Sequence, residues 1–401
     1  MLPLALSSYT TDWLDLLVRW LHVIAGIAWI GSSFYFIALD NHLHLPEQAR
    51  DAGEGVGGEA WEIHGGGFYH VLKYKVAPPK LPEPLLWFKW EAYTTWLSGF
   101  ALLIVLYYVH AGSNLVDRSV ADLSSGQAVL ISVGLLVGGW ILYDVLCRTV
   151  GQRSELLLAV AILGIAVAAA YGSSRLFAPR AAYLQVGSML GTMMAANVFF
   201  VIIPAHWELV RAKKAGREPD PLPGLRAKQR SVHNNYLTLP VVFTMISNHF
   251  PITYGHSRSW LILVALMAIG AWVRHFFNLR HVGVTAWWIP VTAAAGIALV
   301  AVLIRPASAP SVGVTPGKPA SGSAQAGRAV FASAGCAACH TLGRAGAKGT
   351  VGPNLDAVKP SRELVVDRVT NGQGVMPSFK GKLSPQQIEE VAGYVSSVAG
   401  K

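Results

Sequence analysis

Charged residues are scarce in this chain: Asp, Glu, Lys and Arg together make up only 13% of its 401 residues. That is roughly half of their usual share in a soluble globular protein. Hydrophobic residues make up 53%, and Trp occurs 13 times. The composition therefore excludes an ordinary soluble enzyme and predicts a polytopic membrane protein, in which Trp rings gather at the two membrane interfaces.

Cysteine is scarce as well, with Cys147, Cys336 and Cys339 as its three occurrences. Two of them belong to one motif, so a disulfide framework is not expected. A cleavable signal peptide is not expected either, because the first apolar stretch follows Asp12 and Asp15 without a basic region and is too long for such a signal. That stretch instead predicts a first transmembrane helix.

Several common functional motifs are missing. We find no HExxH zinc motif and no P-loop, and GEGVGG at residues 53–58 is not followed by a Rossmann unit. The net charge of +10 does not indicate nucleic-acid binding, because membrane topology explains where Lys and Arg stand.

Eight long apolar stretches predict an all-α fold whose N-terminal part is an eight-helix transmembrane bundle. Most of them approach the ~20 residues that cross a bilayer. They lie near residues 14–39, 93–111, 128–147, 155–171, 183–204, 236–250, 259–278 and 286–304. Residues 1–304 are accordingly predicted to form the transmembrane catalytic module.

The distribution of Lys and Arg orients this bundle in the lipid bilayer. Sixteen of these residues fall in the predicted loops on the side opposite the C-terminus, and six fall on the C-terminal side. Because positive charge is retained in the cytoplasm, both termini are expected to be periplasmic if this is a bacterial inner-membrane protein.

The composition changes after the last apolar stretch. The segment RPASAPSVGVTPGKPASGSA, residues 305–324, is rich in Pro, Ser, Ala and Gly, which predicts a flexible linker. Residues 325–401 then predict a small soluble domain, with helices around 325–334 and 384–398.

The motif CAACH, at residues 336–340, predicts a covalent heme c in this domain. Two thiols at this spacing can bond both heme vinyl groups, and His340 follows as an axial ligand of the iron. Met376, in GVMPSF, is the expected second axial ligand. A zinc or redox CxxC is the alternative, but the Met-Pro pair, the flanking helices and the domain length favour one heme c, bound by Cys336, Cys339, His340 and Met376 in a class I-like cytochrome c fold.

A heme c transfers single electrons and does not select a substrate, so the chemistry is expected in the bundle, where ionisable groups are costly and often functional. Asp15, Arg19 and His22 recur on one face of the first helix, which indicates either a substrate wall or a polar packing seam. The stretch HNNYLTLPVVFTMISNHFP, residues 233–251, carries His and Asn at both ends. The catalytic candidates are Arg19, His22, His233, Asn235, Asn248 and His249. Arg274, by contrast, is interpreted as a positive-inside anchor.

Four segments together resemble the membrane-bound, cytochrome c-linked urate oxidase family, also called urate hydroxylase. They are RWLHVIAGIAWIGSSFYF, GGGFYHVLKYKVAP, WFKWEAYTTWLSGF and HNNYLTLPVVFTMISNHFP. The resemblance covers essentially the whole chain. It implies oxidation of urate to 5-hydroxyisourate, with electrons passed to cytochrome c and the respiratory chain and without hydrogen peroxide. A soluble cytochrome c or a terminal oxidase would then accept the electrons.

The residue types suit this substrate. Urate is a planar anion at neutral pH, so a site needs Arg or protonated His for its charge and Asn amides for its carbonyl and N–H edges. The two ends of 233–251 lie at opposite membrane faces, so one compact site is not expected to use both. A b-type heme held by His22 and His249 is a further hypothesis. A cytochrome c-linked dehydrogenase of another small molecule or a quinol, and an electron-transfer subunit, are the alternative functions.

Overall fold

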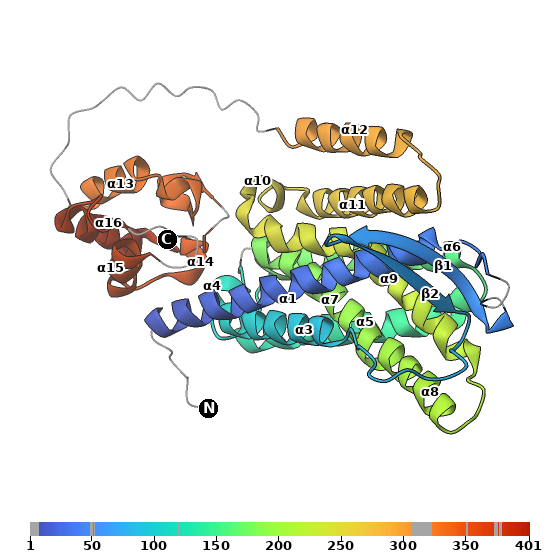
Figure 1. Cartoon of the computed structure of the whole chain (residues 1–401). Helices are drawn as coiled ribbons and strands as arrows, with labels where there is room; N and C mark the ends of the chain where they lie inside the picture. The colour runs from blue at the N-terminus through green and yellow to red at the C-terminus, as the bar shows by residue number, and fades with distance from the viewer. Residues whose placement is uncertain are drawn as a thin grey trace.

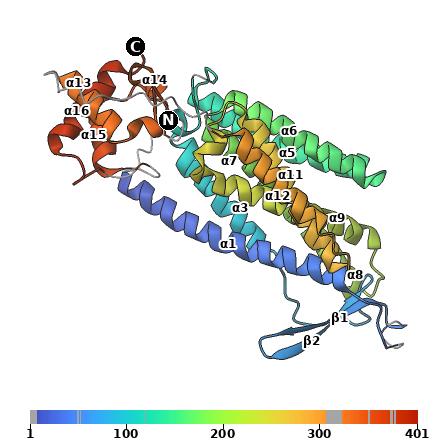
Figure 2. The same cartoon turned by 90° about the horizontal axis from the view of Figure 1, so that it is seen from above.

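The computed structural model describes residues 8–48, 51, 53–118, 120–305, 323–349, 352–372, 376 and 379–401. It contains a bundle of long helices, a β-hairpin and a small helical domain, with the hairpin and the small domain at opposite ends of the bundle (Figures 1 and 2). The predicted linker, 305–324, lies almost entirely outside the described residues.

Each of the eight predicted apolar stretches coincides with a helix. These helices are α1 (Ser8–His42), α3 (Trp90–Leu103), α5 (Ser125–Thr149), α6 (Glu155–Leu176), α7 (Pro179–Asn197), α9 (Pro221–Ile246), α11 (Ser259–His281) and α12 (Trp288–Leu303). Three shorter helices accompany them: α4 (Ala111–Asn114), α8 (Ile203–Lys214) and α10 (Pro251–Tyr254). The predicted number of eight is therefore wrong, because the described part of the bundle contains eleven α-helices, eight long and three short.

The extra helices have local causes. A π-helical turn, Val198–Ile202, separates α7 from α8. Pro204 is the second residue after this turn, and its ring and missing N–H disfavour the regular hydrogen bond to the carbonyl of Phe200. The helices α4 and α10 are single turns in the connections after α3 and α9.

Among the described residues, five helical segments are long and apolar enough to cross a membrane: Trp13–His42, Ser125–Gln152, Glu155–Leu176, Pro179–Lys214 and Ser259–His281. The helix α12 is apolar but has only 16 residues. Large apolar side chains such as Trp20, Ile27 and Leu130 are exposed on the outside of the bundle. An outward-facing apolar surface of this kind needs lipid, so the prediction of a membrane protein is confirmed at this level.

The helix α9 lies in the middle of the bundle and packs against α1, α7, α8 and α11. Close approach to α7 depends on Gly187, because a side chain there would collide with Thr244 of α9. Gly270 of α11 similarly faces Leu239 and Pro240 of α9. Small residues at these crossings allow α9 to present side chains to α5 and α7 on one face and to α1 and α11 on the other.

The all-α prediction needs a correction, because the connection between α1 and α3 contains a β-hairpin. The strands β1 (Val56–His64) and β2 (Gly67–Tyr74) pair antiparallel. Gly65 and Gly66 both have positive φ, as a tight two-residue hairpin turn requires. The described fold is thus mostly helical, with this exposed hairpin and a two-residue antiparallel strand pair, β3 (Thr341–Leu342) and β4 (Ala347–Lys348), in the C-terminal domain.

The C-terminal domain is built from α13 (Ser323–Ser333), α14 (Leu355–Val358), α15 (Arg362–Asn371) and α16 (Pro385–Val398). Its core contains Phe331 and Val391, which are almost fully buried. Gly327 of α13 lies against Tyr394 of α16, where any side chain would collide, so the first and last helices cross closely. This agrees with the two helices predicted for the domain.

Candidate functional site

The heme-attachment motif lies in a tight turn directly after α13. A 3-10 turn, Cys336–Ala338, follows Gly335, whose φ of 77° suits glycine. Nδ1 of His340 lies 2.9 Å from the carbonyl oxygen of Pro353, so Nδ1 carries the proton and donates it. Burial lowers the pKa of His340, which keeps the imidazole neutral. The lone pair of Nε2 is then free for iron, as in most metal-bound histidines.

The surroundings of this motif fit a heme c. Gly352 lies flat against the His340 ring, where a side chain would collide with it. Met376 is partly buried and packs against the apolar core of the domain, while the adjoining Pro377 lies outside the described residues. Cys336 and Cys339 are free thiols. The domain thus supplies two thiols, an oriented imidazole and a thioether.

The residues predicted on α1 form a packing seam rather than a gathered site. Arg19 pairs with Asp15 of its own helix at 2.6 Å, and both side chains are partly exposed. Nδ1 of His22 lies 2.9 Å from the carbonyl oxygen of Thr95 on α3. Gly99 of α3 makes room for the His22 ring. The geometry supports the packing interpretation for this face of α1.

The two ends of the 233–251 stretch remain apart. The Oδ1 atom of Asn248 is buried without a hydrogen-bond partner, whereas His249 is exposed. Within the described residues, His249 contacts neither His22 nor Asn248 through a polar side-chain interaction. His233 and Asn235 stand about 200° apart around α9, so they face different neighbours.

His233 belongs to a closed polar network, which we call the Arg230 cluster: Tyr143, Asp144, Asn197, Arg230, His233 and Asn234. Arg230 donates to Asp144 at 2.7 Å and to Asn197 at 3.3 Å. Asn197 donates to Tyr143 at 2.9 Å, and the Tyr143 hydroxyl also lies 2.9 Å from Nδ1 of His233. Among the described residues, no buried side-chain nitrogen or oxygen of this cluster lacks a partner.

Asn235 belongs to a second, open cluster, which we call the Arg274 cluster: Asn235, Arg274 and Asn278. Both Arg274 Nε and Asn278 Nδ2 donate to Oδ1 of Asn235, at 2.8 and 3.1 Å. The guanidinium carbon of Arg274 lies 3.8 Å from the centre of the Phe34 ring. Three buried atoms here have no partner within the described chain: Arg274 Nη2, Asn235 Nδ2 and Asn278 Oδ1.

The interpretation of Arg274 as an interfacial anchor is therefore wrong, since the residue is only 4% exposed. Sequence reasoning did not join Arg274 and Asn278 to Asn235. Their spacing of four on one helix was the available signal, because it places both side chains on the same face of α11.

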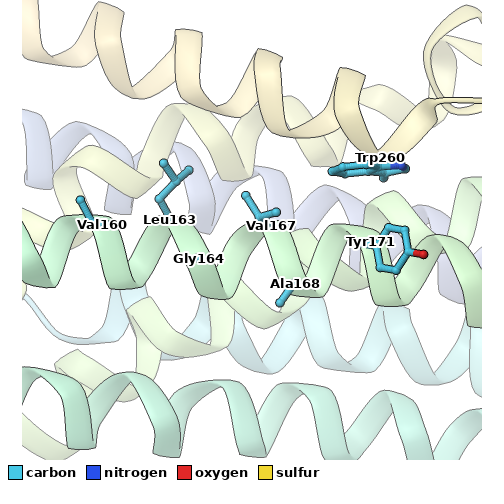
Figure 3. A pocket seen from close by; sticks show the side chains of 7 residues that line it. All are labelled: Val160, Leu163, Gly164, Val167, Ala168, Tyr171 and Trp260. Atoms are coloured by element: carbon cyan, nitrogen blue, oxygen red, sulfur yellow. The ribbon is translucent and has the colours of Figure 1, made fainter.

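An apolar groove on the outside of the bundle is a weaker candidate. Residues of α6 and Trp260 of α11 line a volume of about 480 Å³ (Figure 3). The Tyr171 and Trp260 rings meet edge to face at one end. A groove lined by aliphatic and aromatic side chains suits a lipid chain better than a polar anion.

Comparison with known proteins identifies the bundle. A family model described as "Urate oxidase N-terminal" matches residues 8–305, well over half of the chain. The chain belongs to this family. A second model, described as "Cytochrome C oxidase, cbb3-type, subunit III", matches residues 322–395. This urate oxidase family chain is thus fused to a C-terminal cytochrome c domain.

Several similar proteins are small cytochromes. Cytochrome c6 of Leptolyngbya boryana is 45% identical over 82 residues, which is 20% of this chain and 95% of that protein. Cytochrome c6 of Limnospira maxima is 45% identical over 92 residues, 20% of this chain and 98% of that protein. Among solved structures, the c-type cytochrome SorU from Sinorhizobium meliloti is 50% identical and covers 20% of this chain and 93% of its own, with a TM-score of 0.19. The cytochrome family model and the cytochrome c6 relatives imply a covalent heme c in the C-terminal domain.

Proposed function

We propose that this protein oxidises urate to 5-hydroxyisourate in its bundle and passes the electrons to its own heme c. One observation carries the proposal: a urate oxidase family bundle and a heme c motif stand in one chain. Urate and water give 5-hydroxyisourate, two protons and two electrons. These electrons would leave one at a time toward the heme, and oxygen would take no part, so no hydrogen peroxide would form.

The heme, when bound, supplies a one-electron acceptor. Cys336 and Cys339 would attach it, and His340 and Met376 would hold the iron. The thioether of Met376 raises the reduction potential relative to a second imidazole. We place this domain, residues 325–401, on the periplasmic face of a bacterial inner membrane, after a module of residues 1–304. From there a soluble cytochrome c or a terminal oxidase takes each electron.

The bundle must carry electrons over much of its length if urate binds far from the cytochrome domain. The helix α1 alone has 35 residues, about 50 Å at 1.5 Å per residue. The b-type heme hypothesis therefore stays a prediction. One ring nitrogen of His22 lies 2.9 Å from the carbonyl oxygen of Thr95, and His249 is exposed. We assign no step to such a heme, and a pyridine hemochrome spectrum would count b and c hemes separately.

An anaerobic titration tests the proposed function. Urate is added to the oxidised, purified protein, and the α-band of reduced heme c is followed. We expect about two equivalents of heme reduced per urate consumed. Reduction by a quinol but not by urate would favour the dehydrogenase alternative. Reduction by neither would favour an electron-transfer subunit.

A further inference from the structure

We infer that the Arg274 cluster is the binding site for the urate anion, through Arg274, Asn235 and Asn278. This inference rests on the proposed function and specifies where its substrate binds. Among the described residues, the positive charge of Arg274 has no acidic partner. Arg274 is 4% exposed, and no carboxylate among the described residues forms an ion pair with it.

A buried charge without a counterion is expensive, because removing an ion from water costs several kcal/mol that only a partner restores. Asp40, an acidic residue near the C-terminal end of α1, forms its ion pairs with other residues. It pairs with Lys73 of the hairpin and, at 3.6 Å, with Lys228. Arg230 shows that the bundle can supply a counterion where the arginine is structural, since Asp144 lies 2.7 Å away. The missing partner of Arg274 is therefore expected to come from a ligand.

The unpartnered atoms define what that ligand presents. Arg274 Nε can only donate, so the atom it meets on Asn235 is the carbonyl oxygen, and Nδ2 of Asn235 remains a free donor. The same oxygen accepts from Asn278 Nδ2, which leaves Oδ1 of Asn278 as a free acceptor. A ligand that fits two donors, one of them charged, and one acceptor is an anion with both carbonyl and N–H groups. Urate has these groups along its edges.

The hairpin follows the C-terminal end of α1, at the opposite end of the bundle from the cytochrome domain (Figure 2). Phe34 lies in the second half of α1, and Asn41 near its end donates to the backbone carbonyl of Asn278 at 3.5 Å. Arg274 and Asn278 stand in the last two turns of α11. Substrate would therefore enter from the hairpin side, while electrons leave at the opposite end.

The test measures urate binding to the full-length holoprotein in nanodiscs, reduced beforehand with dithionite. Ferrous heme cannot accept electrons, so radiolabelled urate binds without turnover and equilibrium dialysis gives its Kd. We expect Arg274→Gln to weaken binding about 100-fold, as loss of a buried charged partner does. Arg280→Gln removes an exposed charge from the same helix and is the matched control. It should leave Kd unchanged.

A second variant keeps the inference testable if Arg274→Gln does not fold. Asn278→Asp supplies an internal carboxylate beside Arg274, so it should abolish urate binding without lowering the unfolding temperature. If the wild type binds urate and reduces heme c but both variants keep its Kd, the Arg274 cluster is not the urate site. The proposed function would still stand in that case. A wild type that neither binds urate nor transfers its electrons would reject the proposed function as well.

Discussion

The bundle buries two arginines to nearly the same degree but provides an acidic partner for only one of them. Arg230 is 3% exposed and Arg274 is 4% exposed. Arg230 has a carboxylate and an amide oxygen as acceptors, whereas Arg274 has one amide oxygen and an aromatic ring face. Burial is therefore not what separates a structural arginine from a ligand-binding one. Whether the chain itself supplies the counterion makes the difference.

The closed cluster also joins more of the fold. It connects α5, α7 and α9, and His233 reaches the exposed Glu155 of α6 at 3.6 Å. The open cluster connects α9 and α11 beside α1, and it leaves two donors and one acceptor unused. A network with all of its polar atoms paired stabilises the bundle, whereas one with unused atoms costs free energy until a ligand arrives.

The largest effect on stability is expected from a substitution that breaks the closed cluster. Arg230→Gln removes the buried cation of Asp144 and leaves it only Arg148, an exposed residue of the same helix 2.6 Å away, so it should lower the free energy of unfolding by about 2–3 kcal/mol. Circular dichroism during chemical unfolding in detergent would measure the loss. The double variant Arg230→Gln with Asp144→Asn removes both charges and should recover most of it. Equal losses in the single and double variants would contradict the role of this ion pair.

A smaller effect is expected when a substitution supplies a counterion inside the open cluster. In the absence of urate, Asn278→Asp should raise the free energy of unfolding by about 1 kcal/mol. A charged hydrogen bond to Arg274 should outweigh both the cost of burying the carboxylate and the loss of the hydrogen bond to Asn235. Thermal unfolding of the ligand-free protein gives the comparison.

The matched control is Asn234→Asp in the closed cluster. Nδ2 of Asn234 donates to the carbonyl oxygen of Met194 at 3.0 Å, so a carboxylate there would face a carbonyl. Because the nearby Arg230 is already paired with Asp144, no unpaired cation would compensate, and the protein should be destabilised. A loss of stability in both variants would show that the buried charge of Arg274 is not stabilised by an added anion.

The smallest effect concerns the outer end of the closed cluster. Glu155 is mostly exposed, so Glu155→Gln should change the free energy of unfolding by less than about 1 kcal/mol. Its hydrogen bond with Gln229 can persist through the remaining amide oxygen. Urate-dependent reduction of heme c, followed in a stopped-flow spectrometer, should be unchanged. A marked slowing would indicate that protons leave through this cluster.

The cytochrome domain was largely predictable, because its chemistry is local in the sequence. The motif places Cys336, Cys339 and His340 within five residues, and the apolar pattern indicates the two flanking helices. The hydrogen bond from His340 to Pro353 spans 13 residues, so its geometry depends on the folded domain. The comparisons confirm the domain type.

The bundle was predictable only in outline. Apolar length indicated the eight long helices, but the π-helical turn after α7 and the single-turn helices made the predicted count wrong. The catalytic roles predicted for Arg19, His22, His233, Asn235, Asn248 and His249 remain predictions, and only Asn235 enters the proposed substrate site. Neighbours on one helix, such as His233 and Asn235, proved to belong to different clusters.

The sequence by itself determined the membrane class, the heme c motif and the resemblance to urate oxidases, because composition, apolar length and short motifs are local properties. The tertiary structure alone decided which buried arginine is paired. Asp144 lies 86 residues before Arg230 in the chain, and Asn235 lies 39 residues before Arg274. Only the packing of α9 between its neighbours brings a carboxylate to one arginine and leaves the other without a counterion.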